Sequence, residues 1–149
     1  MEMSVDRVDL WAAGMNDKPG ELARVLNGLK SAGADFDFVI ARRDHENPGK
    51  AVVFVSPLRR EKEISAATAL GFKNAKSMYS VRVEGENRAG IGADLTNLIS
   101  QAGISIRGFS GATCGSRFVL YFSFDVAEDA DKSMSILCDY EKSCRPMVH

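Results

Sequence analysis

The sequence repeats itself at an offset of 70 residues, and this repeat limits the folds that the chain can adopt. Between Asp17 and Gly33, five of 17 positions are identical to their counterparts 70 residues later, where composition alone would give about one. The identical pairs are Gly20/Gly90, Ala23/Ala93, Asn27/Asn97, Ala32/Ala102 and Gly33/Gly103. We infer an internal duplication, which predicts two similar modules over residues 1–76 and 77–149.

Both copies carry the same order of sequence patterns: a strand, a polar turn, a helix, two strands and a second helix. In the first copy, these patterns predict strands at 8–13, 35–40 and 51–56, helices at 22–33 and 60–70, and a short last strand at 74–77. In the second copy, they predict strands at 79–84, 104–107 and 117–126, and helices at 91–103 and 127–137. This order is that of an α+β fold with two ferredoxin-like βαββαβ modules, each an antiparallel sheet with helices on one face.

The third strand of each copy is apolar on both faces. Val52 and Phe54 alternate with other apolar residues in one copy, as Val119 and Tyr121 do in the other. A sheet that is covered by helices on one face only should be polar on its other face. Modules of about 70 residues are also marginally stable alone. We therefore expect a homodimer or a higher homo-oligomer, or packing of one module on the other.

Two stretches, NDKPGELARVLNGLKSAG and ENRAGIGADLTNLISQAGISI, resemble ACT domains, which are small amino-acid-sensing modules. The resemblance covers nearly the whole chain, as two modules with no enzyme domain attached. It implies that amide groups at a helix start bind the ligand's carboxylate, and that nearby oxygens bind its amino group. The sequence departs from the family where an asparagine often begins the second strand, because Asp35 and Ser105 occupy those positions.

The two polar turns are the candidate binding elements. Pro19 suits the first turn of a helix, with Asp17 or Lys18 near its cap, and Asn87 could cap the second helix. Free N–H groups at a helix start can bind a carboxylate, although helix capping alone would also explain these residues. The Gly90 and Gly92 pair predicts that the second turn is the more open one. The candidate ligand-binding residues are Asn16, Asp17, Lys18, Pro19, Gly20, Glu21, Asp35, Glu86, Asn87, Arg88, Ala89, Gly90, Ile91 and Ser105.

The free energy of ligand binding that one such turn can supply is small, which predicts a site at an interface. A helix start contributes about 0.3–1 kcal/mol to anion binding, whereas micromolar affinity requires about 8 kcal/mol. One turn is far short of this free energy. The ligand should therefore lie at a module or subunit interface, where a second surface supplies the remaining contacts.

The sequence offers no catalytic residue, metal site or cofactor site. It has no nucleophile elbow, H-E-x-x-H or P-loop, and its three cysteines fit no standard zinc spacing. The net charge of −1 argues against nucleic-acid binding. No apolar run has the length of a membrane span. The polar start MEMSVDR is unlike a signal peptide, so we expect a cytoplasmic protein with free thiols.

These observations predict a non-catalytic regulatory protein that binds a small ligand, with an amino acid as the expected ligand. Two alternatives stay open. The chain could be a regulatory subunit that acts in trans on an amino-acid biosynthetic enzyme, or it could be a dimerisation module without a ligand.

Overall fold

The protein was analysed as a computed structural model that describes residues 2–144. The chain forms two compact units. The first module consists of residues 9–76, and the second module combines residues 2–8 with residues 77–144.

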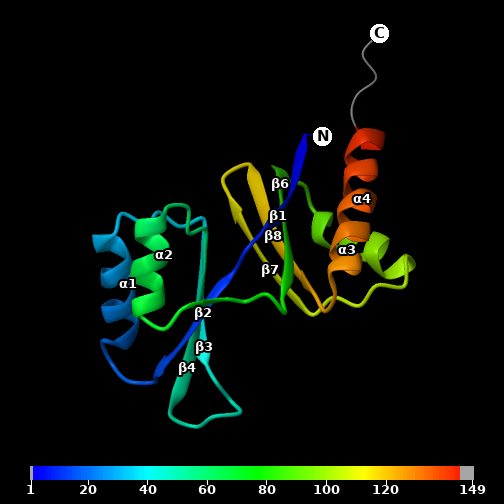
Figure 1. Ribbon diagram of the computed structural model, residues 1–149. Coiled ribbons are helices and arrows are strands. Elements are labelled where there is room, and N and C mark those ends of the chain that lie inside the picture. Colours follow the sequence, from blue (N-terminus) through cyan, green and yellow to red (C-terminus); the bar gives the residue numbers. More distant parts are fainter. Residues whose placement is uncertain (1, 145–149) are drawn as a thin grey trace. The chain divides into compact units, whose positions relative to one another are not determined.

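The first module has four strands and two helices. Its elements are β2 (Trp11–Asn16), α1 (Glu21–Ser31), β3 (Phe38–Arg43), β4 (Lys50–Ser56), α2 (Glu61–Ala69) and β5 (Lys73–Asn74). The sheet has the order β3-β4-β2-β5, and each neighbouring pair is antiparallel. Figure 1 shows α1 and α2 side by side on one face of this sheet.

The second module repeats this topology with one strand drawn from the other end of the chain. Its elements are β1 (Met3–Val8), β6 (Tyr79–Glu86), α3 (Ile91–Gln101), β7 (Gly108–Cys114), β8 (Arg117–Phe124) and α4 (Ala127–Cys144). The sheet has the order β1-β6-β8-β7, again antiparallel throughout. The predicted α+β fold with two ferredoxin-like modules is therefore confirmed.

The N-terminal strand corrects the expected assignment of the first residues. We placed residues 1–8 in the first module, but β1 pairs with β6 over its whole length, from Met3 opposite Gly85 to Val8 opposite Ser80. It takes the place that β5 takes in the first module. The helix expected at 127–137 continues instead to Cys144 as α4. Residues 145–149 lie outside the described residues. Because β1 pairs with β6, the second module obtains its fourth strand from the N-terminal segment.

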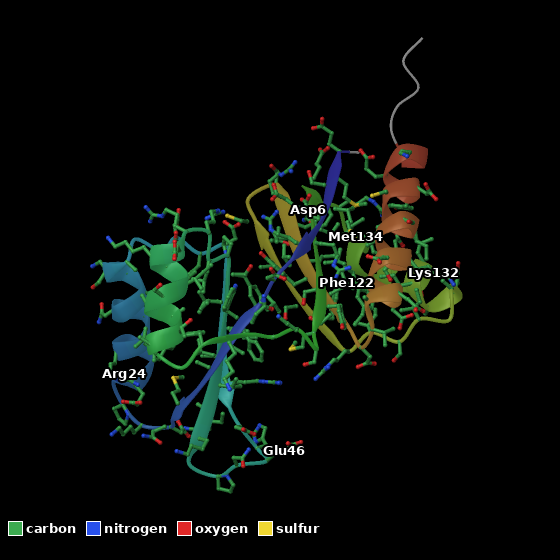
Figure 2. The ribbon with its side chains drawn as sticks, in the orientation of Figure 1. Asp6, Arg24, Glu46, Phe122, Lys132 and Met134 are labelled. Carbon is green, nitrogen blue, oxygen red and sulfur yellow. The ribbon has the colours of Figure 1, made fainter. Side chains whose placement is uncertain are left out.

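Each module has its own apolar core between its sheet and its helices. In the first module, Val25 and Leu29 of α1 pack against Val53 and Val55 of β4, with Phe72 beside them. The second core is richer in aromatic residues: Phe118, Phe122 and Phe124 of β8 are all buried. Figure 2 shows Phe122 and Met134 in the layer between this sheet and α4. Full burial of such a side chain stabilises the fold by about 1.5–3 kcal/mol.

The faces opposite the helices differ between the modules. In the first module, Phe54 pairs with Ala12 on one side and Ile40 on the other, which gives the apolar face that the sequence predicts. The second module differs from the expectation, because the neighbours of Val119 and Tyr121 in β6 are charged. Arg82 donates hydrogen bonds to the Tyr121 hydroxyl at 3.1 Å and to Glu84 at 2.6 Å.

The edge strand β3 of the first module also differs from its predicted position. Strand β3 begins at Phe38 rather than near residue 35, because β4 ends at Ser56, which pairs with Phe38 and whose carbonyl accepts the N–H of Asp37. Val39 and Ala41 consequently face the helices, while Ile40 is 38% exposed on the other face. No helix among residues 2–144 is long and apolar enough to cross a membrane.

Candidate functional site

The two polar turns have the same backbone conformation. Gly20 and Gly90 precede α1 and α3 with φ angles of +88° and +84°, in the left-handed region that favours glycine. The N–H of Asp17 donates to the carbonyl of Gly49 at 2.9 Å, and that of Asn87 donates to Ser116 at 2.8 Å. Each turn is therefore tied to the start of the third strand of its own module. The duplication has preserved a backbone shape as well as a set of residues.

Neither helix is capped by the side chains that we expected. Gly20 and Gly90 are the N-cap residues, and no side chain of the described residues accepts a capping hydrogen bond at either position. Arg43 Nε instead donates a hydrogen bond to the Asp17 carboxylate at 2.8 Å, and the two side chains form an ion pair. The N–H groups of the second and third helical residues have no acceptor within the helix. They are available to water or to an anionic ligand.

Side chains around the first turn form a network of opposite charges. Lys50 Nζ donates to the Asn16 side chain at 2.7 Å. Arg24, labelled in Figure 2, donates to the Glu21 carboxylate at 3.2 Å. This hydrogen bond holds the pKa of Glu21 below its usual value of 4.5, so the carboxylate stays ionised to lower pH than a free glutamate. Lys18 is exposed and makes no ion pair with any described residue.

Two cavities lie against the first turn. One has a volume of about 460 Å³, and its lining residues are Gly14, Met15, Asn16, Glu21, Arg24, Asp44, Asn47, Lys50, Ala51 and Val52. The other has about 210 Å³, and its lining residues are Met15, Asn16, Asp17, Lys18, Glu21, Leu22, Ala41, Arg42, Arg43 and Ala51. Four of the predicted site residues, Asn16, Asp17, Lys18 and Glu21, therefore border open space. A side chain added at Gly20 would meet no atom within 4 Å.

One side chain of the second turn connects it to α3 and α4. Arg88 donates to the carboxylate of Asp94 on α3 and to the hydroxyl of Tyr140 on α4. These two contacts raise the pKa of Arg88 above its ordinary value. Of the other predicted residues here, Glu86, Asn87, Ala89 and Gly90 are exposed, but Ile91 is buried in the core and can offer a ligand only its backbone. The glycine pair in the sequence predicts greater openness here, whereas the structure shows this turn tied to α4.

Asp35 and Ser105 do not join the turns of their own modules. Each follows the C-terminal end of a helix whose start carries the turn. An 11-residue helix such as α1 is about 16 Å long. Within one module, therefore, Asp35 cannot contact a ligand that is bound at the 16–21 turn. It could do so only from another copy of the chain.

Several residues at these sites were missed by the sequence reasoning. Arg24, Asp44 and Lys50 line the larger cavity, and Asp94 and Tyr140 hold the second turn. The repeat offered one signal, because Arg24 aligns with Asp94 and the charge is thus reversed between the copies. Among the described residues, no group of three or more His, Cys, Asp or Glu side chains could hold a metal ion.

No protein-family model and no curated protein matches the chain, but solved structures match its fold. The protein BT0572 from Bacteroides thetaiotaomicron has a TM-score of 0.74 at 13% identity, over 92% of this chain and 90% of that one. The ligand-free regulatory subunit of aspartate kinase from Thermus thermophilus has 0.62 at 16%, over 92% and 95%. Aspartokinase III from E. coli, in complex with aspartate and ADP, has 0.55 at 15%, over 92% of this chain and 32% of that one.

Identities this low establish the fold alone. The chain has the two-module, ferredoxin-like α+β fold of these structures.

Proposed function

We propose that this chain is a non-catalytic regulatory protein whose first module binds an amino acid. The observation that carries the proposal is the duplicated turn, whose backbone is the same in both modules but which borders two cavities in the first. The fold is that of chains described as regulatory subunits of aspartate kinase, and this likeness supports a regulatory role.

The first turn offers complementary chemistry for an amino acid. The N–H groups at the start of α1 can donate to a carboxylate, and the exposed ammonium of Lys18 adds positive charge beside them. The side-chain oxygens of Asn16, Asp17 and Glu21 can accept hydrogen bonds from an ammonium group. In the second module, Arg88 is held by Asp94 and Tyr140. We therefore assign the ligand to the first turn, with Gly90 and its neighbours as a structural copy.

The second surface of this site is proposed to come from another copy of the chain. Val39 on β3 and Phe109 on β7 occupy equivalent positions, 70 residues apart, on equivalent edge strands of the two sheets. They are 41% and 48% exposed. Exposed apolar residues on an unpaired edge strand favour association with another strand. A homodimer through such an edge would bring Asp35 of one copy toward a neighbouring copy.

A role as a separate regulatory subunit is the second candidate. It is favoured by the likeness of fold to the regulatory subunit of aspartate kinase from Thermus thermophilus, at a TM-score of 0.62. Affinity purification of the tagged chain from its native lysate tests this role. Recovery of an amino-acid biosynthetic enzyme in a fixed ratio supports it, whereas recovery of the chain alone contradicts it.

The amino-acid proposal is tested by thermal-shift measurement with each of the twenty amino acids. We expect at least one to raise the Tm in a saturable manner. Gly20→Ala should weaken that response, because it disturbs the backbone at the start of α1, whereas Gly90→Ala should lower the Tm without changing the response. If none of the twenty amino acids raises the Tm, the chain is a module without an amino-acid ligand.

A further inference from the structure

The sheet of the first module has one edge that is only partly paired. Strand β5 is two residues long and lies beside Trp11 and Ala12 of β2. The remaining residues of β2, 13–16, have no strand beside them on that side in the described part of the chain. In the second module, β1 covers the equivalent strand β6 over six residues. The first module therefore has an open edge, residues 13–16 of β2, where the second module has a strand.

The hydrogen-bond register shows which backbone groups face this open edge. The N–H of Asp17 donates to the carbonyl of Gly49, on the side of β2 that pairs with β4. The backbone groups of successive residues in a strand point alternately to its two sides. The N–H and the carbonyl of Gly14 therefore face the open edge, and so does the N–H of Asn16.

The second module shows what these groups bind when a strand is present. Glu86, which corresponds to Asn16, donates its N–H to the backbone carbonyl of Glu2 at 3.4 Å. In the first module, the N–H of Asn16 instead donates to the carboxylate of Glu21. The counterpart of Glu21 in the second module is Ile91, which has no carboxylate. The Glu21 carboxylate thus occupies the place that the carbonyl of an added strand would take.

Gly14 is the residue at the centre of the open edge, and nothing within residues 2–144 requires a glycine there. Its φ angle is outside the left-handed region, and a Cβ atom would meet no atom within 4 Å. Glycine weakens the interior of a strand, and it often marks a position that another backbone approaches closely. Gly14 also lines the cavity of about 460 Å³, together with its cross-strand neighbour Val52. A large side chain opposite a glycine in a sheet can cover such a position.

An extended peptide segment is the occupant that fits this edge. One residue offers a donor and an acceptor, and the residue two positions further offers a donor, which is the spacing of an antiparallel ladder. The space beside the turn is wide enough for a strand, because β1 lies beside the equivalent turn with Met3 opposite Gly85. Strand β1 pairs with β6 over its whole length, so the segment comes from outside this chain.

A second copy of β2 fits the open edge less well than a partner segment does. Pairing of Gly14 with Gly14 of another copy would place Asn16 opposite Ala12, where β5 already lies. Pairing of Gly14 with Asn16 would cover the glycine with a polar amide. An apolar side chain covers Gly14 and Val52 in neither arrangement.

We propose that the open edge of β2 binds an extended segment of a partner protein by strand addition, antiparallel to β2. The segment's residue opposite Gly14 exchanges two backbone hydrogen bonds with it and carries a large apolar side chain over Val52. Its neighbours in the segment are polar, because Asn16 and Lys50 line the same cavity. The Asn16 N–H then donates to a carbonyl of the segment in place of Glu21. This interaction uses the main chain of β2 and goes beyond the proposed function, since it requires no amino-acid ligand.

Amide chemical-shift titration of the full, isotope-labelled chain with synthetic hexapeptides tests this proposal. The probe is acetyl-Thr-Lys-Thr-Phe-Thr-Ser-amide, and two further probes have valine or glycine in place of phenylalanine. We expect saturable shifts at residues 12–16, in the millimolar range that a few backbone hydrogen bonds support. Binding should be strongest with phenylalanine and weakest with glycine. A probe that is N-methylated at the phenylalanine amide cannot donate to the Gly14 carbonyl and should not bind.

A proline variant tests the edge itself. Gly14→Pro removes the N–H that faces the open edge and keeps the hydrogen bonds to β4, so the variant should fold and lose binding of the phenylalanine probe. Glu84→Pro is the matched control at the equivalent position of the second module. The N–H of Glu84 faces β1, so this variant should destabilise the second module and leave peptide binding by the first unchanged. The N-methylated probe makes the same test on the wild-type chain, without a substitution.

The strand-addition proposal is overturned by any of three results. The first is the absence of saturable shifts with all of the probes. The second is equal affinity of Gly14→Pro, or of the N-methylated probe, which would show that the peptide binds elsewhere. The third is a wild-type oligomer that dissociates in Gly14→Pro, which would make this edge an interface between copies. A chain that binds the phenylalanine probe but responds to none of the twenty amino acids supports this proposal and contradicts the proposed function alone.

Discussion

At the scale of single residues, the turn glycines determine how each helix begins. Gly20 has a φ angle of +88°, a conformation that costs other residues about 1–2 kcal/mol. Gly20→Ala should therefore destabilise the first module by about that amount, although the added methyl group would contact no atom within 4 Å. Urea unfolding measures the loss.

Gly14→Ala is the matched control for this prediction. Gly14 is in β2 with ordinary strand dihedrals, and a methyl group there would also meet no atom within 4 Å. The variant should have nearly wild-type stability. Equal losses in the two variants would show that the backbone conformation is not the reason for Gly20.

A second residue-scale prediction concerns Glu63 on α2. Its carboxylate accepts hydrogen bonds from the side chain and the backbone N–H of Arg60, at 2.8 Å and 3.1 Å. The Arg60 side chain also donates to the carbonyl of Gly33 at 3.1 Å, which connects α2 to the end of α1. The hydrogen bonds from Arg60 hold the pKa of Glu63 below 4.5.

Because the folded-state pKa of Glu63 is lowered, its stabilisation is present above the unfolded-state pKa. It is lost as the pH falls through the folded-state pKa. The wild type should therefore lose Tm more steeply below about pH 4.5 than Glu63→Gln does. Melting curves at a series of pH values measure this difference, and Glu61→Gln serves as the exposed control. Parallel pH profiles for wild type and Glu63→Gln would contradict the assignment.

At the scale of elements, β1 differs from its counterpart in the first module. The equivalent strand β5 follows the second helix of its module in the sequence, whereas β1 comes from the start of the chain. Met3 is buried in the core of this module, and Arg7 forms a 2.7 Å ion pair with Asp131 on α4. Deletion of residues 1–8 should destabilise the second module by at least about 2 kcal/mol, the cost of losing one large buried side chain. Residues 9–76 should keep their stability. Hydrogen exchange of each module measures this, and equal loss of protection in both would contradict the topology.

The helices could be predicted from sequence patterns, whereas one strand could not. The helices were predictable because Val25 and Leu29 recur at helical spacing and because Gly33 ends the helix with a positive φ. Strand β1 was not predictable from its own residues, since Arg7 and Val8 reverse the alternation that Met3 to Asp6 begin. Its pairing joins residues about 80 positions apart, and no local pattern reports such a contact.

The candidate site was predictable in its turns but not in its surroundings. The repeat indicated Gly20 and Gly90, and the structure gives both the same left-handed conformation. The ion pair of Asp17 with Arg43 and the bridge from Arg88 to Tyr140 depend on the folding of distant segments. The sequence therefore predicted a helix cap where the structure has an ion pair.

At the scale of the whole molecule, we predict at least a homodimer. Light scattering at micromolar concentration should give about twice the 16.2 kDa mass of one chain. Val39→Glu and Phe109→Glu place a charge on each edge strand in turn, and the variant on the associating edge should shift the mass toward the monomer. A monomeric wild type at these concentrations would contradict the prediction.

The central claim is that the first module binds an amino acid at its turn, with a second surface from another copy of the chain, and that the second module is a structural copy. Amide chemical-shift mapping of the full, isotope-labelled chain tests this claim most directly, with the amino acid that raises the Tm most as the titrant. We predict saturable shifts confined to residues 9–76, with no shifts at 86–91. Saturable shifts at the second turn, or no saturable shifts in either module, would contradict the claim.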